Sequence, residues 1–396
     1  MSNNYGLADP ASVDLTSPDV DVRAITCFLN QGANEYDGRI GARVSSIFVI
    51  GIISTAFTFF PVVATRATRF HIPIYVYLFA RYFGAGVIVA TAFIHLLAPA
   101  YDVIGPATCV GMTGGWAEFA WPPAIALVSA MLTFLMGFAA ERYVHKKYKL
   151  PHAIKEGSSQ RDLERTVSVD QAMLRYETSR RESTHQEQHS HQGLHSSDQD
   201  QQMQHHHTDE RKEAYDNGDL DSVDAEKDRV ADIAFRQQIS AFLVLEFGVL
   251  FHSVIIGLAL GTAGAEFATL YPVLVFHQSF EGLGIGARLS AIPFPKRLKW
   301  MPWTLCGAYG LTTPIAIAAA LGVRTTYNAG SFTASVVSGV LDSLSAGILL
   351  YTGFVELIAR DFLFNPDRTD DDKQLTFMII CLLLGVALMA LLGKWA

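Results

Sequence analysis

Long apolar segments alternate with short polar segments along most of the chain. A helix needs about 20 mostly apolar residues to cross the roughly 30 Å of hydrocarbon in a bilayer, and it satisfies its own backbone groups in lipid. The pattern therefore predicts an all-α membrane protein with eight transmembrane helices. The expected spans are residues 42–65, 74–98, 121–144, 236–261, 267–291, 300–322, 332–358 and 375–394.

Two segments outside these spans are predominantly polar. Residues 1–41 form an acidic tail, and residues 146–233 form a long insert between the third and fourth spans. The insert has few aromatic residues and no sustained apolar period, which is typical of disordered segments. We therefore expect an extracellular tail (1–41), transmembrane helices 1–3 (42–145), a disordered cytoplasmic loop (146–233) and transmembrane helices 4–8 (234–396).

Basic residues in the short loops predict the orientation, because Lys and Arg concentrate on the cytoplasmic side of a membrane. The four odd-numbered loops are rich in Lys and Arg, whereas the second and fourth loops contain neither and the sixth contains only Arg324. We therefore expect the odd loops in the cytoplasm and both termini outside, with the plasma membrane as the expected location. Arg23, Arg39 and Arg43 near the N-terminus oppose this assignment, although acidic residues accompany them.

Composition narrows the functional class. Hydrophobic residues make up 50% of the chain and charged residues 17%, and the formal net charge of -8 does not suit a nucleic-acid-binding surface. Four cysteines are too few for a disulfide framework. Cys27 and Cys109 fall in segments expected on the same outer face and could pair, whereas Cys306 and Cys381 lie within apolar spans. No cleavable signal peptide is evident at the N-terminus.

The long loop contains a histidine-rich tract at residues 185–207. Neutral imidazoles bind Zn²⁺ and similar ions, so the tract could buffer or sense metal on the cytoplasmic side. The alternative is a low-complexity tract without such a role, and the spacing does not favour a single structural zinc site. Its seven histidines are His185, His189, His191, His195, His205, His206 and His207.

Ionisable residues near the centres of the fourth and fifth spans are the strongest functional signal, because such residues are costly in lipid. His252 lies on the fourth span, and His277 and Glu281 lie four residues apart on one face of the fifth. Two imidazoles and one carboxylate suit Zn²⁺, with a further position left for water or a mobile ligand. The alternative is a His–Glu pair that satisfies itself in the core.

Other charged residues have simpler interpretations. Glu246 lies six residues before His252, so it does not share the same helical face; it either lines a pathway or, as we slightly prefer, pairs with an arginine at the membrane boundary. Glu356 and Arg360 are expected to form an intrahelical pair. Arg81 is expected to extend to the cytoplasmic interface.

The motifs around His252, His277 and Glu281 resemble those of the ZIP (Zrt-, Irt-like protein) family of metal transporters, particularly its fungal zinc-uptake members. The resemblance covers all eight spans in order. It implies inverted repeats of spans 1–3 and 6–8 around spans 4 and 5, and metal import towards the cytosol by an elevator-like movement. The matching segments are Phe251-His252-Ser253-x-x-x-Gly257, His277-Gln278-x-x-Glu281-Gly282, Ala92-Phe93-Ile94-His95-Leu96-Leu97 and Asp342-Ser343-Leu344-Ser345-Ala346-Gly347.

Carried onto this sequence, the resemblance implies a transport site at His252, His277 and Glu281. It also makes His95, near the outer end of the second span, a further ligand or an entry residue.

The chain departs from the two-ion pattern that many members of this family have. Ser253 and Ile256 stand where relatives have Asn and Glu, Gln278 stands where an Asp is frequent, and Thr313 stands where some relatives have a Glu. We therefore predict one ion at a time, with Ser253 and Gln278 as secondary candidates for metal contact.

The expected partners are a divalent cation and the lipid bilayer, with no nucleic acid; a homodimer is left open. Zinc is expected as a transported substrate and no cofactor is expected, although Fe²⁺, Mn²⁺ or Cd²⁺ would suit the same ligands. The alternatives are a membrane-embedded zinc hydrolase and a metal-responsive receptor or channel. A hydrolase needs a general base beside the metal, and the His-Glu-x-x-His arrangement that supplies one is absent from the sequence. We therefore expect a transporter and not an enzyme.

Overall fold

The computed structural model describes residues 24–25, 27, 36–66, 73–148, 217–326, 328–364, 369 and 371–395. The histidine-rich tract at 185–207 and most of the tail at 1–41 lie outside the described residues, so the expectations for them stay predictions. The chain divides into two compact units, one of residues 1–150 and 237–396 and the other of residues 151–236.

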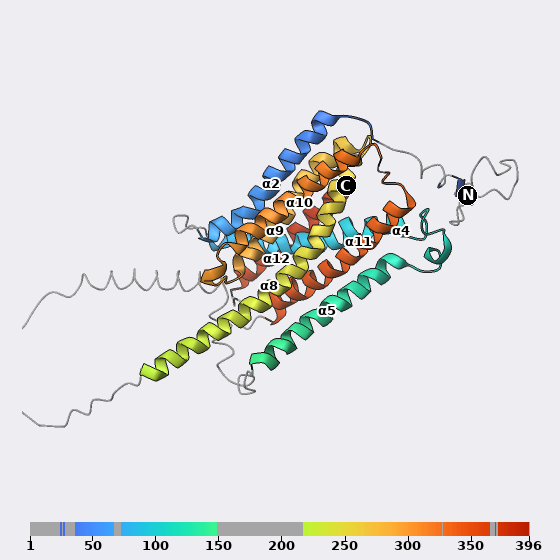
Figure 1. Cartoon of the computed structure of the whole chain (residues 1–396). Coiled ribbons are helices and arrows are strands. Elements are labelled where there is room, and N and C mark those ends of the chain that lie inside the picture. Colours follow the sequence, from blue (N-terminus) through green and yellow to red (C-terminus); the bar gives the residue numbers. More distant parts are fainter. Residues whose placement is uncertain are drawn as a thin grey trace, which may run out of the picture. The chain divides into compact units, whose positions relative to one another are not determined.

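The part of the chain that the structure describes is helical and contains no strand. A long helical segment coincides with each of the eight expected spans (Figure 1). In chain order these are α2 (Ile40–Arg66); α3 (Ile74–Ala90) with η1 (Thr91–Leu97) and α4 (Ala98–Ile104); α5 (Trp121–Tyr148); α8 (Asn217–Thr262); α9 (Phe267–Ala291); α10 (Met301–Val323); α11 (Phe332–Tyr351) with η5 (Thr352–Phe364); and α12 (Asp372–Leu392). Short 3-10 turns occur at η2 (Gly114–Trp116) and η4 (Lys296–Leu298).

Seven of these segments are both long enough and apolar enough to cross a membrane. The eighth, α9, has 25 residues, and at 1.5 Å per residue its length also suffices. Helix α9 is more polar than these seven segments because it carries His277, Gln278 and Glu281 near its centre and Arg288 in its last turn. The fold prediction is confirmed, and the chain is an integral membrane protein.

Helix α8 begins earlier than the sequence pattern indicated. It starts at Asn217, so residues 217–233, which we assigned to the loop, are helical. This segment is predominantly acidic, with Lys227 and Arg229 as its basic residues, and Arg236 Nε lies 2.7 Å from Asp232 Oδ2 one turn away. Ion pairs four residues apart support a polar helix without any apolar face.

Helix α9 packs between neighbours on two sides within the unit of residues 1–150 and 237–396. It contacts α2 and α10 on one side and α3 on the other, while α3 also packs on α12 and α11 packs on α5, η1 and α4. Glycines permit this closeness, as small residues commonly do between membrane helices. A Cβ on Gly286 would overlap the carbonyl oxygen of Thr58 in α2, and one on Gly284 would lie 2.8 Å from the Cα of Gly84 in α3.

Helix α8 also approaches its neighbours through glycines. A Cβ on Gly257 would lie 2.6 Å from the Cβ of Ala316 in α10, and one on Gly248 would lie 2.7 Å from Leu349 in α11. The central part of α8 is therefore held closely against α10, next to the polar centre of α9.

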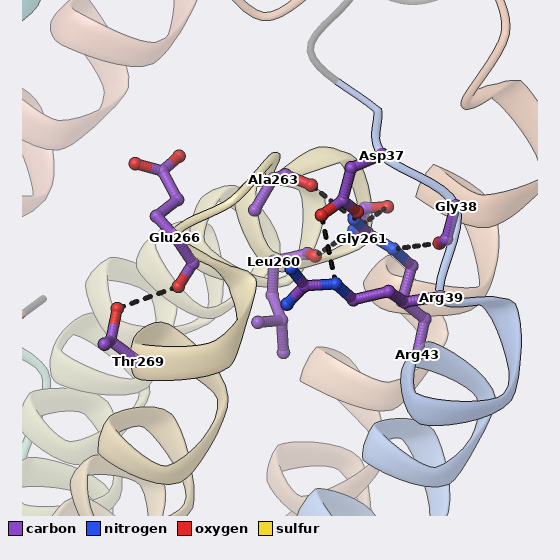
Figure 2. Close-up of polar contacts among 9 residues, drawn as sticks. All are labelled: Asp37, Gly38, Arg39, Arg43, Leu260, Gly261, Ala263, Glu266 and Thr269. Atoms are coloured by element: carbon purple, nitrogen blue, oxygen red, sulfur yellow. Dashed lines mark hydrogen bonds and ion pairs between the residues drawn. The ribbon is translucent and has the colours of Figure 1, made fainter.

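A buried arginine connects the beginning of α2 to the end of α8 (Figure 2). The side chain of Arg43 is fully buried, and its guanidinium lies between the rings of Tyr36 and Phe267, at 4.7 and 4.6 Å from their centroids. An arginine carries five N–H donors, and here five bonds are formed. The acceptors are the carbonyl oxygens of Gly38, Leu260, Gly261 and Ala263 and the carboxylate of Asp37.

Cys27 and Cys109 form a disulfide, as their expected common location suggested. Cys306 and Cys381 are buried free thiols. The disulfide therefore connects the segment before α2 to the connection between α4 and α5.

Candidate metal centre

Three predicted ligands meet where the centres of α8 and α9 face each other. The Nε2 atoms of His252 and His277 lie 3.3 Å apart, and Nε2 of His277 lies 3.9 Å from Oε2 of Glu281. One ligand atom from each of the three residues lies within 4.8 Å of the other two, and all three side chains are buried. Spacing of four residues places His277 and Glu281 on one face of α9, and His252 approaches them from α8.

Several polar atoms of this cluster have no hydrogen-bond partner among the described residues: Nδ1 of His252, Nδ1 of His277 and Oε1 of Glu281. A buried polar atom without a partner costs about 1–3 kcal/mol, so native proteins contain few of them. Their concentration at one point does not fit a self-satisfied His–Glu pair. A cation bound by the two Nε2 atoms and the Glu281 carboxylate would supply the interaction that Oε1 lacks, although not those of the two Nδ1 atoms.

Tyr309 of α10 is a contact of this cluster that the sequence analysis did not identify. Its hydroxyl lies 3.0 Å from Oε2 of Glu281 and 3.1 Å from Oε1 of Gln278, and the side chain is fully buried. The only signal in the sequence is a hydroxyl group at the middle of an apolar span, since buried tyrosine hydroxyls usually find a partner. Tyr309 positions the Glu281 carboxylate from a third helix.

His95 lies beside the cluster, in the π-helical segment η1. Its ring contacts that of His277, with centroids 4.6 Å apart and planes at 83°, but its Nε2 lies 3.1 Å from the carbonyl oxygen of Met389 in α12. A π-helical turn is rare and is frequent at functional sites. The structure thus brings His95 to the site, although it does not belong to the group of three converging ligand atoms.

The two secondary candidates for metal contact, Ser253 and Gln278, are as fully buried as the histidines that precede them. Ser253 is fully buried and its Oγ has no partner within the described ranges. Gln278 is fully buried, with Oε1 near Tyr309 and Nε2 unpaired in the same sense. The Thr313 hydroxyl of α10 is buried and also lacks a described partner. All three of these side chains offer neutral groups and no carboxylate.

Within the described residues, the structure does not show the ion pair between Glu246 and a boundary arginine that we slightly preferred. Glu246 is buried, and in the described parts of the chain neither carboxylate oxygen has a hydrogen-bond partner, so no pair with a boundary arginine is seen. It lies within electrostatic range of Glu281 instead. The remaining interpretation is that Glu246 lines a pathway that leads from the cluster.

Two other charged groups can be placed. Arg360 Nη1 lies 3.1 Å from Glu356 Oε2, so the predicted intrahelical pair is confirmed. Arg81 is held by Asp361, with Nε 3.1 Å from Oδ2 and Nη2 2.8 Å from Oδ1. The expectation that Arg81 simply extends to the interface omitted this partner, which lies 280 residues away in sequence.

Comparisons with known proteins point to one class. The family described as "ZIP Zinc transporter" matches residues 40–393. The chain is 51% identical to Zinc-regulated transporter 1 of Saccharomyces cerevisiae over 98% of this chain and 97% of that protein. It is 36% identical to Zinc-regulated transporter 1 of Schizosaccharomyces pombe, over 94% and 89% of the two chains, and 34% identical to Zinc-regulated transporter 2 of Saccharomyces cerevisiae, over 97% and 100%. No solved structure matches the chain.

Proposed function

Since the chain belongs to the ZIP zinc transporter family, we propose that it imports zinc towards the cytosol and carries the ion at His252, His277 and Glu281. The family consists of transporters, which sets aside the zinc hydrolase. The observation that carries the proposed site is the convergence of three buried ligand atoms from α8 and α9 within 4.8 Å of one another.

The distances in the cluster suit a zinc ion with little adjustment. Zn²⁺ binds imidazole nitrogen and carboxylate oxygen at about 2.0–2.2 Å in tetrahedral geometry, which separates neighbouring ligand atoms by roughly 3.3–3.5 Å. The two histidine nitrogens are 3.3 Å apart, and the His277–Glu281 distance of 3.9 Å needs only a small side-chain shift. Water completes the shell, so the ion is held without a closed four-ligand protein site.

One ion is carried at a time. Ser253, Gln278 and Thr313 offer only neutral groups, and an additional divalent ion adjacent to the first requires further carboxylates to offset the repulsion. Ser253 and Gln278 act as secondary contacts through water. His95 serves on the entry side, because its Nε2 is directed to the Met389 carbonyl oxygen.

The odd loops lie in the cytoplasm, both termini lie outside, and the protein resides in the plasma membrane. The Cys27–Cys109 disulfide supports this orientation, because disulfides persist in oxidising compartments. Arg43, which opposed the orientation, loses its weight as a topological signal because its charge is buried and paired with Asp37.

The contacts around the site suggest which helices move together. Glu281 of α9 is bonded by Tyr309 of α10, and Arg43 of α2 is bonded to the end of α8. His95, by contrast, is bonded to α12. We propose that α2, α8, α9 and α10 move as one body against α3, α5, α11 and α12, in an elevator-like step. The inverted-repeat relation stays a prediction.

Uptake of radioactive zinc by zinc-starved cells tests the proposed cargo site. We expect Glu281→Ala and His277→Ala to abolish the uptake gained on expression, while surface expression stays at the wild-type level. Glu266→Ala is the matched control, because Glu266 is an exposed carboxylate just before α9. Full transport by Glu281→Ala would contradict the site, and competition by Fe²⁺, Mn²⁺ and Cd²⁺ measures selectivity.

A cross-link tests the movement separately. Ala80 of α3 and Leu283 of α9 belong to one apolar cluster, and the pair Ala80→Cys/Leu283→Cys should form a disulfide on oxidation that stops uptake until a reductant is added. Ile50 of α2 and Leu274 of α9 belong to another cluster inside the proposed moving body. The pair Ile50→Cys/Leu274→Cys should therefore retain uptake when oxidised. Equal inhibition of both pairs argues against the elevator-like step.

A further inference from the structure

A small cavity of about 50 Å³ lies between α3, α9 and η5, away from the candidate metal centre. Arg81, Ala85 and Ile88 of α3, Gly284, Arg288 and Ala291 of α9, and Leu357 of η5 line it. At a minimum of about 10–15 Å³ for each water, the space suits several waters or one small oxyanion. Arg288 lies seven residues beyond Glu281, which is about 10 Å along α9. The cavity and the cluster are thus separate sites.

Among the described residues, charge around this cavity is not balanced. Four charged groups lie within electrostatic range of Arg288: Arg81, Arg360, Glu356 and Asp361. Asp361 binds Arg81 through two bonds, and Glu356 binds Arg360 at 3.1 Å. Both acids are therefore engaged by other arginines. Arg288 has no hydrogen bond and no close ion pair with any residue in the described parts of the chain.

The location of Arg288 at the end of α9 compensates only part of its charge. It lies in the last turn of α9, where the helix dipole favours a cation by about 0.3–1 kcal/mol. Arg288 is partly buried, withdrawing an uncompensated charge from water is costly, and charged residues within membrane spans are normally paired. The dipole alone does not remove the need for a counter-ion.

We propose that the cavity between Arg81 and Arg288 is an anion site that takes a phosphate-type oxyanion, supplied by a phospholipid headgroup or by free phosphate. Arg288 supplies the binding charge. Guanidinium groups bind phosphate through paired, charge-assisted hydrogen bonds, and Arg81 presents a further guanidinium at the wall while it remains bound to Asp361. In the proposed orientation this end of α9 faces the cytoplasm, where anionic lipids concentrate. The bound anion would connect α3 to α9.

Binding can be measured on the purified full-length protein without zinc, so the result does not depend on the cargo site. The protein is placed in phosphatidylcholine nanodiscs alone, in the same nanodiscs with inorganic phosphate, or in nanodiscs that contain phosphatidic acid. We expect the phosphatidic acid, the inorganic phosphate or both to raise the melting temperature by a few degrees. Native mass spectrometry counts retained lipid as a second readout.

Variants identify the residue responsible. Arg288→Gln should lose the temperature shift and the retained lipid, whereas Lys296→Gln should keep both. Lys296 is the matched control, because it is an exposed lysine five residues beyond the end of α9 and its replacement removes the same charge. If Arg288→Gln does not fold, Arg288→Lys keeps the charge and should bind about tenfold more weakly, since an ammonium cannot form the paired bonds.

The outcomes separate the two sources and decide the proposal. A response to phosphatidic acid alone identifies a lipid headgroup, and a response to inorganic phosphate identifies a free ion. The proposal is overturned if neither anion shifts the wild-type protein. It is equally overturned if Arg288→Gln, or Arg288→Lys where only that variant folds, responds as strongly as the wild type.

Discussion

Two buried polar clusters lie along helix α8, and they differ in how many of their polar atoms have a hydrogen-bond partner. At its C-terminal end, the guanidinium of Arg43 donates all five of its hydrogen bonds, three of them to carbonyls of residues 260, 261 and 263 (Figure 2). Near the centre of its membrane-spanning part, His252 meets His277 and Glu281, and each of these three residues keeps one buried atom unpaired among the described residues.

This difference separates a structural contact from a ligand site. The last four carbonyls of a helix have no partner inside the helix. Arg43 satisfies two of them in α8, at Leu260 and Gly261, while its charge is compensated by Asp37. Nothing further is needed for that group to be stable. The His/Glu cluster keeps unpaired buried atoms at a cost, and a cation would remove the part of that cost at the Glu281 carboxylate. Its incomplete pairing, together with the convergence of its three ligand atoms, is therefore an indication of function.

The largest expected effect comes from replacing a residue of the unpaired cluster. His252→Ala should abolish zinc uptake and the rise in melting temperature that zinc produces in the wild type. Without zinc its melting temperature should fall by a few degrees at most, because removal of the unpaired Nδ1 offsets part of the cost of the cavity and of the lost His277 contact. Thermal unfolding with and without zinc, together with uptake, measures this.

Ser279→Ala is the matched control for that variant. The Ser279 hydroxyl is already satisfied by the Val275 carbonyl oxygen of its own helix, so both zinc uptake and the zinc-induced shift should persist. If zinc-free His252→Ala is strongly destabilised, the cluster is a structural contact like that of Arg43, and the comparison fails.

The opposite pattern is expected at the fully paired group. Arg43→Met leaves Oδ1 of Asp37 and four carbonyl oxygens without their donor, and breaking a buried charged network typically costs about 3–5 kcal/mol. The melting temperature should fall by roughly 10 °C, with or without zinc. Arg39→Met should cost less than about 1 kcal/mol, because Arg39 is 46% exposed and makes a surface pair with the same Asp37. Equal melting temperatures for the two variants would argue against the structural role of Arg43.

The sequence predicted the helices well because the bilayer imposes a simple rule on them. Apolar length identified all eight helical segments, and ionisable residues within the apolar spans identified His252, His277 and Glu281. The beginning of α8 was missed because residues 217–233 are polar, and helix formation there depends on ion pairs such as Arg236–Asp232 rather than on an apolar period.

Contacts that depend on tertiary packing could not be predicted in the same way. Tyr309 reaches Glu281 from a helix 28 residues away in sequence, and nothing in an apolar segment shows which hydroxyl faces a neighbour. Arg43 was counted as a charge of the N-terminal tail because the sequence does not reveal the free carbonyls at the end of α8, 217 residues later. His95 was placed near the site, but its bond to Met389 depends on how η1 packs against α12.

A smaller effect is expected at Tyr309, because its hydroxyl pairs one oxygen of the incompletely paired cluster. Its hydroxyl bonds Oε2 of Glu281, the oxygen that lies 3.9 Å from His277 Nε2, and Oε1 has no partner among the described residues. Tyr309→Phe should raise the zinc concentration for half-maximal uptake about tenfold, because a hydrogen bond to a charged group contributes roughly 1.5 kcal/mol, while the maximal rate changes less. Tyr271→Phe is the control, since its hydroxyl lies 3.5 Å from Ser45 in an exposed contact. An unchanged affinity in Tyr309→Phe would mean that Glu281 is positioned by α9 alone.

The smallest effect concerns the turn that presents a carbonyl oxygen to Arg43. Gly38 has a φ of 94°, a conformation that a residue with a side chain adopts only with strain, and its carbonyl accepts from Arg43 Nε at 2.9 Å. Gly38→Ala should therefore destabilise the protein by about 1 kcal/mol. Gly41→Ala, three residues later inside α2 and with open space around the position, should stabilise it by a similar amount, because alanine favours a helix. Melting temperatures that move in opposite directions support a turn held by the Arg43 group, whereas a parallel shift of both variants would mean that the turn adapts without the bond.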